Sequence, residues 1–330
     1  MSKFLLKNKH IFFLLIFILL IFPNLRAHCL DKKPEILKIK TREVLRIKTG
    51  SGSDNLGIIL PDEANPEGPM SFALGKDGEI YILDQLNFRI QVFKNNKRIK
   101  TIPIPKDKSL DFKDLEVTPE NKIVLAGEFF KEGRAEKTYI YMLDLDGKVL
   151  NLIKTEPCPP EIHIVAEGQY TGIWLCSKRI ASIDGKETDR IRVPGKLSSD
   201  SKRIIDAKII GEVSAVLYRS EENCLSRWEP EVTVYFNMPI VNLLGIWDDI
   251  KGRIYLGAFL ADEKRGRYSN LVIIFSSDLR EIGRVKLMVS GEPYEIWRSV
   301  KVSPEGSIYQ LYIDKKQYVV IKKYEPNLNE

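Results

Sequence analysis

Histidine is scarce in this chain, and its scarcity excludes several kinds of catalytic site. The 330 residues include three histidines, and His10 and His28 lie in or beside the N-terminal apolar segment. Only His163 remains as a candidate base, and a core or channel-filling role is the commoner one for a lone histidine. The sequence has no Cys-His spacing typical of zinc sites and no nucleophile elbow of a Ser-His-Asp enzyme. It therefore favours a protein without a catalytic centre.

A concentrated basic patch is also missing. The formal net charge is +6, but the first 27 residues carry four positive charges and no Asp or Glu, which leaves +2 on the rest. Proteins that neutralise many phosphates usually show a basic patch or stripe. Nucleic acid is therefore not an expected partner. With 44% hydrophobic and 29% charged residues, the composition is that of an ordinary globular protein.

The N-terminus has the pattern of an export signal. Three lysines precede an unbroken apolar run from Ile11 to Phe22, and Leu25-Arg26-Ala27 follows as a cleavage site. The run is in the signal-peptide range and shorter than the roughly 20 residues that span a bilayer. We expect a signal peptide over 1–27 and a mature protein in the periplasm, cell envelope or extracellular space. Membrane contact is expected only through this segment, if it is retained.

Internal repetition is the strongest pattern in the chain. One module recurs six times: an apolar strand, a turn, a second strand often opened by glycine, a loop and two alternating strands. In the first copy, Pro69–Leu74 leads through Lys76-Asp77-Gly78 into Glu79–Asp84. Successive second strands open 43, 51, 39, 41 and 54 residues apart, near Gly78, Asn121, Gly172, Gly211, Gly252 and Gly306. This spacing is typical of four-stranded propeller blades of about 40 to 50 residues.

The repeat predicts an all-β fold, a six-bladed β-propeller of four-stranded antiparallel blades, because a ring of blades buries both faces of each sheet. We expect a single domain over 28–330, with strand 43–48 closing the ring as the outer strand of the last blade. In the fourth blade, Ile204–Ile210 is taken as the first strand and Ile240–Leu243 as a shared or shortened fourth. The expected blades are 69–104, 111–155, 161–194, 203–243, 244–289 and 296–324.

The stretch from Gly78 to Phe93 resembles an NHL repeat. It has a glycine, an apolar strand, Asp84, Asn87, Arg89-Ile90 and a final aromatic, and the resemblance weakens in the later blades. The whole chain resembles exported bacterial NHL-like six-bladed propellers without a settled activity. The resemblance implies the fold and a tendency to bind proteins, peptides, sugars or small molecules. Asp84, Asn87 and Arg89 are expected to tie their loop together through charge-assisted hydrogen bonds.

Four cysteines follow or adjoin the export signal, and pairing is the default in an oxidising compartment. Cys158 precedes the first strand of the third blade and Cys176 ends its second strand, so antiparallel pairing brings them together. A Cys158–Cys176 disulfide is geometrically reasonable, and Cys224 is the rival partner of Cys176.

Long loops on one face are the expected binding surface. They are 51–69, 127–137, 219–230 and 260–270, and they precede the first strand or follow the second strand of a blade. A solvated rim is the plain alternative for any single residue. The candidate ligand-binding residues are Phe129, Phe130, Arg134, Arg219, Arg227, Trp228, Arg265, Arg267 and Tyr268.

Carboxylates near the inner strands support a second hypothesis, because oxygen ligands of this kind suit calcium or magnesium. With His163, the channel candidates are Asp114, Glu116, Asp206 and Asp248, and Glu295 lies nearby. Six-bladed lactonase-like propellers hold a divalent metal in the channel, but their ligand pattern cannot be matched here residue by residue. We therefore expect no cofactor and predict a non-enzymatic module that binds a protein, peptide or glycan. The alternative is a metal-dependent hydrolase of the lactonase or esterase type.

Overall fold

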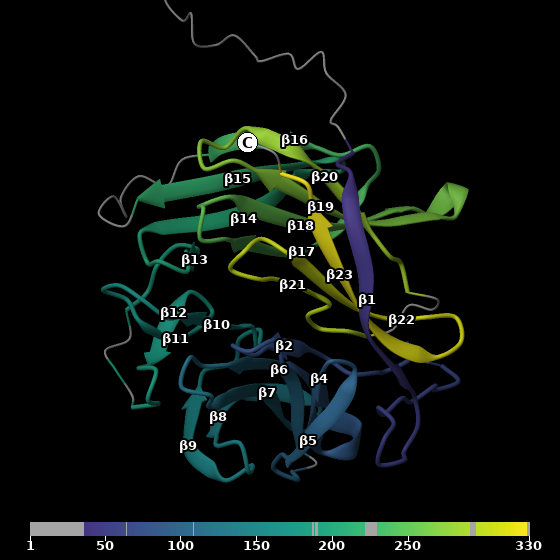
Figure 1. Ribbon diagram of the computed structural model, residues 1–330. Helices are drawn as coiled ribbons and strands as arrows, with labels where there is room; N and C mark the ends of the chain where they lie inside the picture. The colour runs from purple at the N-terminus through teal and green to yellow at the C-terminus, as the bar shows by residue number, and fades with distance from the viewer. Residues whose placement is uncertain are drawn as a thin grey trace, which may run out of the picture. The chain divides into compact units, whose positions relative to one another are not determined.

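The computed structural model describes residues 36–63, 65–107, 109–186, 188, 191–221, 230–290 and 295–328. The expected signal peptide lies outside the described residues. In the described part of the chain, almost all of the regular structure is β-strand, and two three-residue 3₁₀ helices, η2 (Gln85–Asn87) and η4 (Glu263–Arg265), interrupt it (Figure 1). No helix in the described part of the chain is long and apolar enough to cross a membrane.

The strands form six antiparallel sheets, five with four strands and one with three. Each sheet takes its strands in chain order, except that the last recruits β1 from the N-terminal side. In sheet order, the strands are β2 (Phe72–Leu74), β3 (Ile80–Asp84), β4 (Arg89–Lys94) and β5 (Lys97–Pro103); β6 (Leu110–Val117), β7 (Ile123–Lys131), β8 (Arg134–Leu143) and β9 (Val149–Thr155); β10 (Ile162–Val165), β11 (Gly172–Leu175) and β12 (Lys178–Ala181); β13 (Lys196–Leu197), β14 (Arg203–Gly211), β15 (Ser214–Glu221) and β16 (Pro230–Tyr235); β17 (Ile240–Asp248), β18 (Ile254–Asp262), β19 (Arg267–Phe275) and β20 (Glu281–Leu287); and β21 (Val300–Val302), β22 (Ile308–Ile313), β23 (Tyr318–Pro326) and β1 (Ile39–Lys48).

Buried apolar clusters lie between every pair of neighbouring sheets. One cluster joins the first and second sheets, others join the second to the third, the third to the fourth, the fourth to the fifth and the fifth to the sixth, and one joins the sixth to the first. Strands such as β3 are buried along their whole length because another sheet covers each face. This closed series of sheets is a six-bladed β-propeller, as the repeat predicts.

Strand β1 closes the ring. It pairs antiparallel with β23, and Leu45 lies opposite Ile321 and Ile47 opposite Val319. Both β1 side chains are buried in the cluster between the last and first blades. The outer strand of the last blade therefore comes from the start of the described chain, which confirms this part of the predicted fold.

The third and fourth blades differ from the sequence prediction. Strand β14, which includes the expected first strand 204–210, is the second strand of its sheet, and the two-residue β13 precedes it. Residues 240–243 belong to β17 of the fifth blade, not to the fourth blade. In the third sheet the described residues form three strands and an isolated bridge between Lys178 and Arg192, and residues 187, 189 and 190 beside this bridge lie outside the described residues.

We name the strands of each blade A to D in sheet order, with strand A nearest the centre of the ring. The A strands of neighbouring blades contact one another there: β2 contacts β6, and β6 contacts β10. Because antiparallel neighbours reverse direction, the beginnings of strands A and the B–C turns share one side, which we call the entry face. The A–B and C–D turns lie on the other side, the hairpin face.

The first blade contains the loop that resembles an NHL repeat. Asn87 Nδ2 donates to both carboxylate oxygens of Asp84 at 3.0 Å, and Arg89 Nε donates to Oδ2 at 2.7 Å. The backbone N–H of Gly57 also donates to Asp84, at 2.7 Å. These bonds tie η2 and the segment around Gly57 to strands β3 and β4. The three polar side chains therefore hold the loop in place.

Candidate functional site

Asp114, on β6, is the centre of a buried ion cluster. Its Oδ1 accepts from the Ser71 hydroxyl at 2.7 Å, and its Oδ2 accepts from the Ile162 N–H at 2.8 Å and from Arg298 Nη1 at 2.6 Å. Burial alone would raise the pKa of Asp114, but Arg298, Lys301 and the Ser71 hydrogen bond outweigh it and hold the pKa below its usual value. The carboxylate therefore stays ionised inside the ring.

Glu116, two residues along the same strand, completes the cluster. It accepts from Lys301 Nζ and, at 3.2 Å, from Arg298 Nη1. Two carboxylates thus face two cations, and the cluster joins the first, second, third and sixth blades. Buried ions arranged in this way hold elements in register.

The channel acids do not converge on a common point as a metal site would require. Asp206 lies on β14, and Asp248, on β17, accepts from the N–H and hydroxyl of Ser199, each at 3.0 Å. Glu295 is exposed, and its backbone N–H donates to the Pro66 carbonyl. Across the described ranges, no group of three or more His, Cys, Asp or Glu side chains is placed to hold a metal ion.

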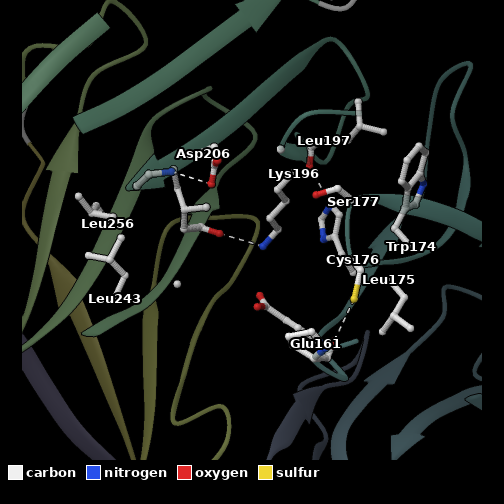
Figure 2. A pocket seen from close by; sticks show the side chains of 16 residues that line it. Glu161, Trp174, Leu175, Cys176, Ser177, Lys196, Leu197, Asp206, Leu243 and Leu256 are labelled. Atoms are coloured by element: carbon white, nitrogen blue, oxygen red, sulfur yellow. Dashed lines mark hydrogen bonds between the residues drawn. The ribbon is translucent and has the colours of Figure 1, made fainter. Parts of the chain in front are cut away.

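A cavity of about 470 Å³ opens near the entry face, among the third, fourth and fifth blades. Side chains of β10, the β11–β12 turn, β13, β14, β17 and β18 line it (Figure 2). Its apolar wall includes Trp174, Leu197, Leu243, Ile246 and Leu256. Cavities of this size and character are typical of small-molecule sites.

Lys196 is the cationic group of this cavity. Its Nζ donates to the Ile246 carbonyl at 2.8 Å, and across the described ranges no carboxylate lies within 4.0 Å of it. Burial lowers the pKa of Lys196 to about 8, and the charge of Arg298 adds to the effect, against Glu161 and Asp248. Sequence reasoning missed this residue, because it lies in a two-residue strand without a visible period.

His163, the lone candidate base, is also part of the cavity wall. Its Nε2 is hydrogen-bonded to the Leu197 carbonyl at 2.7 Å, which makes this nitrogen the protonated one. Burial, followed by the charge of Lys196, lowers the pKa of His163 well below its ordinary value, so the ring is neutral. A neutral ring whose Nε2 proton is held by a carbonyl can position a ligand through its other nitrogen.

Two carboxylates face the same space. Glu161 is exposed and precedes β10, and its side chain makes no hydrogen bond or ion pair with any described residue. Burial raises the pKa of Asp206, and Glu161 adds to the effect, while the N–H of Ala207 at 2.9 Å and Lys208 oppose it. Figure 2 shows the Lys196 amine and the Glu161 carboxylate pointing into one hollow.

The structure contains a disulfide between Cys158 and Cys176, with 6.4 Å between the Cα atoms. Cys176 lies in the β11–β12 turn and, with Ser177, lines the cavity. The bond therefore ties the segment that enters β10 to the turn beside it, and restrains one wall of the cavity. The rival partner, Cys224, lies outside the described residues, as does Cys29.

The candidate loop residues of the second and fifth blades lie on long hairpins instead of loops. Phe129, Phe130 and Arg134 lie on β7 and β8, which a two-residue turn joins, and Phe129 stacks on Tyr139 at 5.2 Å. Strand pairing thus continues to the tip of this hairpin on the entry face.

The hairpin of β18 and β19 in the fifth blade is also paired up to its tip. Arg265 lies in η4, and Arg267 and Tyr268 begin β19. Arg267 Nη2 lies 2.9 Å from Asp262 Oδ2, and Tyr268 stacks on Phe259 at 6.3 Å. These side chains are tied to their own hairpin and contribute nothing to the lining of the cavity.

Arg219 is placed on the opposite side from the sequence prediction. It lies near the end of β15, which is strand C, and strand C runs from the entry face to the hairpin face. Its Nη1 donates to the Ser277 carbonyl of the neighbouring β19–β20 turn. Arg227 and Trp228 lie outside the described residues. The one-strand shift in the fourth blade therefore places Arg219 near the hairpin face.

A second hollow, of about 840 Å³, lies on the hairpin face. The A–B turns of the first, second and sixth blades line it, together with residues of β1 such as Arg42 and Glu43. Apolar side chains such as Ile80 and Phe93 also line it, but the polar share of its lining is larger than in the entry-face cavity, so we take the latter as the candidate site.

Comparisons with known proteins find similar solved structures but no family for this chain. No protein-family model matches the chain, and no curated protein matches it. Solved structures that match over most of their length are β-propeller proteins. The PQQ-bound aldose sugar dehydrogenase from Streptomyces coelicolor is 11% identical, with a TM-score of 0.49, over 89% of this chain and 100% of that one. A glucose dehydrogenase is 11% identical, with a TM-score of 0.48, over 86% and 98%. Virginiamycin B lyase from Staphylococcus aureus is 12% identical, with a TM-score of 0.40, over 87% and 99%.

Proposed function

We propose that this protein is a binding module without catalytic activity, and that its ligand occupies the entry-face cavity. The observation that carries the proposal is the cavity itself: about 470 Å³ of space with an apolar wall and a few polar groups, Lys196, His163 and Asp206 among them. A rigid closed ring holds these groups, which lowers the entropy lost when a ligand binds.

The polar groups of the cavity are arranged for binding more than for chemistry. Lys196 and His163 each donate to a backbone carbonyl, and no serine, threonine or cysteine among the described residues is hydrogen-bonded to His163. A nucleophile needs a base within hydrogen-bonding distance. The described part of the cavity offers polar recognition without that pair.

The alternative, a metal-dependent hydrolase, needs carboxylates that face a metal ion. Asp114 and Glu116 face Arg298 and Lys301 instead, and so the geometry favours binding. Metal analysis of the purified protein, with the melting temperature before and after chelation, separates the two functions. About one equivalent of calcium or magnesium whose removal lowers the melting temperature would favour the hydrolase.

A neutral apolar dye tests the binding function directly. N-phenyl-1-naphthylamine should bind at one saturable site, and its fluorescence should rise. Ala207→Trp fills the cavity and should abolish that signal, while Val149→Trp on the outer strand β9 is the matched control. Equal dye binding in both variants, with unchanged melting temperatures, would place the ligand elsewhere.

We propose further that the protein is exported. The lysine-led apolar segment before residue 28 supports this, and so does the Cys158–Cys176 disulfide, because disulfides persist in oxidising compartments. N-terminal sequencing of the protein from fractionated cells tests the proposal: a mature start at His28 in the periplasmic or extracellular fraction is expected. An intact N-terminus in the cytoplasmic fraction would contradict it.

A further inference from the structure

The entry-face cavity carries charges of both signs. Lys196 enters from β13, Glu161 from the segment before β10, and Asp206 from β14 (Figure 2). The neutral His163 adds no charge. A ligand that fits must therefore satisfy a cation and at least one carboxylate at once.

Lys196 has hydrogen-bonding capacity left for an anion. An ammonium group has three N–H donors, and the one described acceptor is the Ile246 carbonyl. Within the described ranges no carboxylate lies within 4.0 Å to neutralise it. Keeping a charge out of water is costly unless an opposite charge is near, so a ligand carboxylate would gain from contact with Nζ.

The carboxylates would oppose a simple anion. Glu161 makes no ion pair among the described residues, and the nearest cation to Asp206 is the exposed Lys208, at 3.9 Å. A monoanion at Lys196 would be repelled by Glu161, and a monocation at Glu161 would be repelled by Lys196. A zwitterion satisfies both groups.

The rest of the cavity is apolar. Leu243, Ile246 and Leu256, all from the fifth blade, form one wall. The volume of about 470 Å³ is larger than a single ion needs. Apolar surface of this kind favours a ligand with an aliphatic or aromatic body.

We propose that the ligand is a small zwitterion with an apolar body, namely an apolar amino acid or short peptide with free ends. Its carboxylate binds Lys196 and its ammonium group binds Glu161, with Asp206 adding negative potential. This inference rests on the proposed binding function of the same cavity.

Four forms of one dipeptide test the proposal by calorimetry: Leu-Leu, its N-acetyl form, its C-terminal amide, and the doubly capped form. Hydrogen bonds to charged groups contribute enough that each cap should weaken binding about 10- to 100-fold. The doubly capped peptide should bind most weakly. Equal affinities for all four forms would overturn the zwitterion proposal.

Two variants assign each end of the ligand. On Lys196→Met, Leu-Leu and its amide should bind equally, because the partner of the carboxylate is gone. On Glu161→Gln, Leu-Leu and its N-acetyl form should bind equally. Lys202→Met, an exposed lysine on the hairpin face, is the control and should keep the wild-type order. A cap effect of the same size in all three variants would contradict the assignment.

The dye and dipeptide experiments together distinguish a failure of the zwitterion proposal from a failure of the proposed binding function. If the dye binds at a site that Ala207→Trp blocks but no dipeptide binds up to millimolar concentration, the binding function stands and the zwitterion fails. If neither dye nor dipeptide binds, both fail.

Discussion

Arg298 and Asp114 form an ion pair of 2.6 Å, although 184 residues separate them in the chain. Arg298 precedes β21 of the last blade, and Asp114 lies on β6 of the second. The same Arg298 nitrogen donates to the Ile162 carbonyl at 2.7 Å, at the start of the third blade. One guanidinium thus connects three blades across the ring centre, so its loss should affect the ring as a whole.

Replacing Asp114 tests the ion cluster. Asp114→Ala leaves Arg298 and Lys301 with an uncompensated buried charge, and removal of one partner of a buried pair costs about 3–5 kcal/mol of unfolding free energy. Urea denaturation at pH 7 measures the loss. A change below about 1 kcal/mol would show that water or Glu116 compensates for the missing carboxylate.

The ion cluster also predicts that the protein loses stability in acid. The pKa of Asp114 is lower in the folded than in the unfolded chain, so the unfolded chain binds more protons in acid. Its stabilising contribution should be complete above the ordinary value of 3.8 and decline as the pH falls below it. Denaturation midpoints of the wild type and Asp114→Asn between pH 7 and pH 2 should therefore converge in acid. Parallel curves would contradict the prediction.

Lys196 predicts a pH dependence of the same direction in an alkaline window. Its pKa is about 8 in the fold against 10.5 in the unfolded chain, so the unfolded chain binds more protons between these values and stability rises with pH. Lys196→Met should be more stable than the wild type at pH 7, by on the order of 2 kcal/mol, and the gap should narrow toward pH 10. Thermal melts at several pH values measure it, with Lys202→Met as the control. A gap independent of pH would mean that the amine is well solvated.

The disulfide should stabilise the third blade, in which the described residues form three strands. The two cysteines are 18 residues apart, and closing a loop of that size is worth about 3 kcal/mol in the chain-entropy model. Cys158→Ser should lower the unfolding free energy by about that amount and weaken dye binding in the adjoining cavity. Reductant should lower the melting temperature of the wild type but not of the variant. Equal sensitivity to reductant would point to another bond.

Ring closure should depend on β1. Leu45 and Ile47 are almost fully buried, so Leu45→Ala should cost about 2–4 kcal/mol. Lys40→Ala, an exposed position on the same strand, should cost little. A deletion of residues 36–48 should leave the edge of β23 unpaired and the whole ring destabilised, which circular dichroism and aggregation assays would detect. Survival of a cooperative, unshifted transition in the deletion would contradict the closure.

The sequence predicted the parts of the fold that repeat. Alternation over 43–48 identified a strand without a blade of its own, and the polar pattern of Asp84, Asn87 and Arg89 predicted a tied loop. A two-residue strand such as β13 has no period, so the sequence predicts 204–210 as strand A and Arg219 on the entry face, whereas the structure places Arg219 near the hairpin face. The error was local because β17 restores the order at residue 240.

The site was less predictable, because it depends on pairs that are distant in the chain. Carboxylates at 114 and 116 suggested metal ligands, but Arg298 and Lys301 reach them from the last blade, and no local pattern signals that. Two basic residues three positions apart at the start of an inner strand are the one hint in the sequence. The burial of Lys196, which makes it the cation of the cavity, cannot be predicted from composition.

The pairing of β1 with β23 has a consequence for how the protein is made. Arg46 and Asp314 form an ion pair at 2.6 Å across this junction, and 268 residues separate them. Among the described strands, β1 is made first, and its edge stays uncovered until β23 has been made. Contacts of such long range form slowly, and unfinished chains expose strand edges. The last blade therefore cannot be completed until β23 has been made, so the ring closes late in folding.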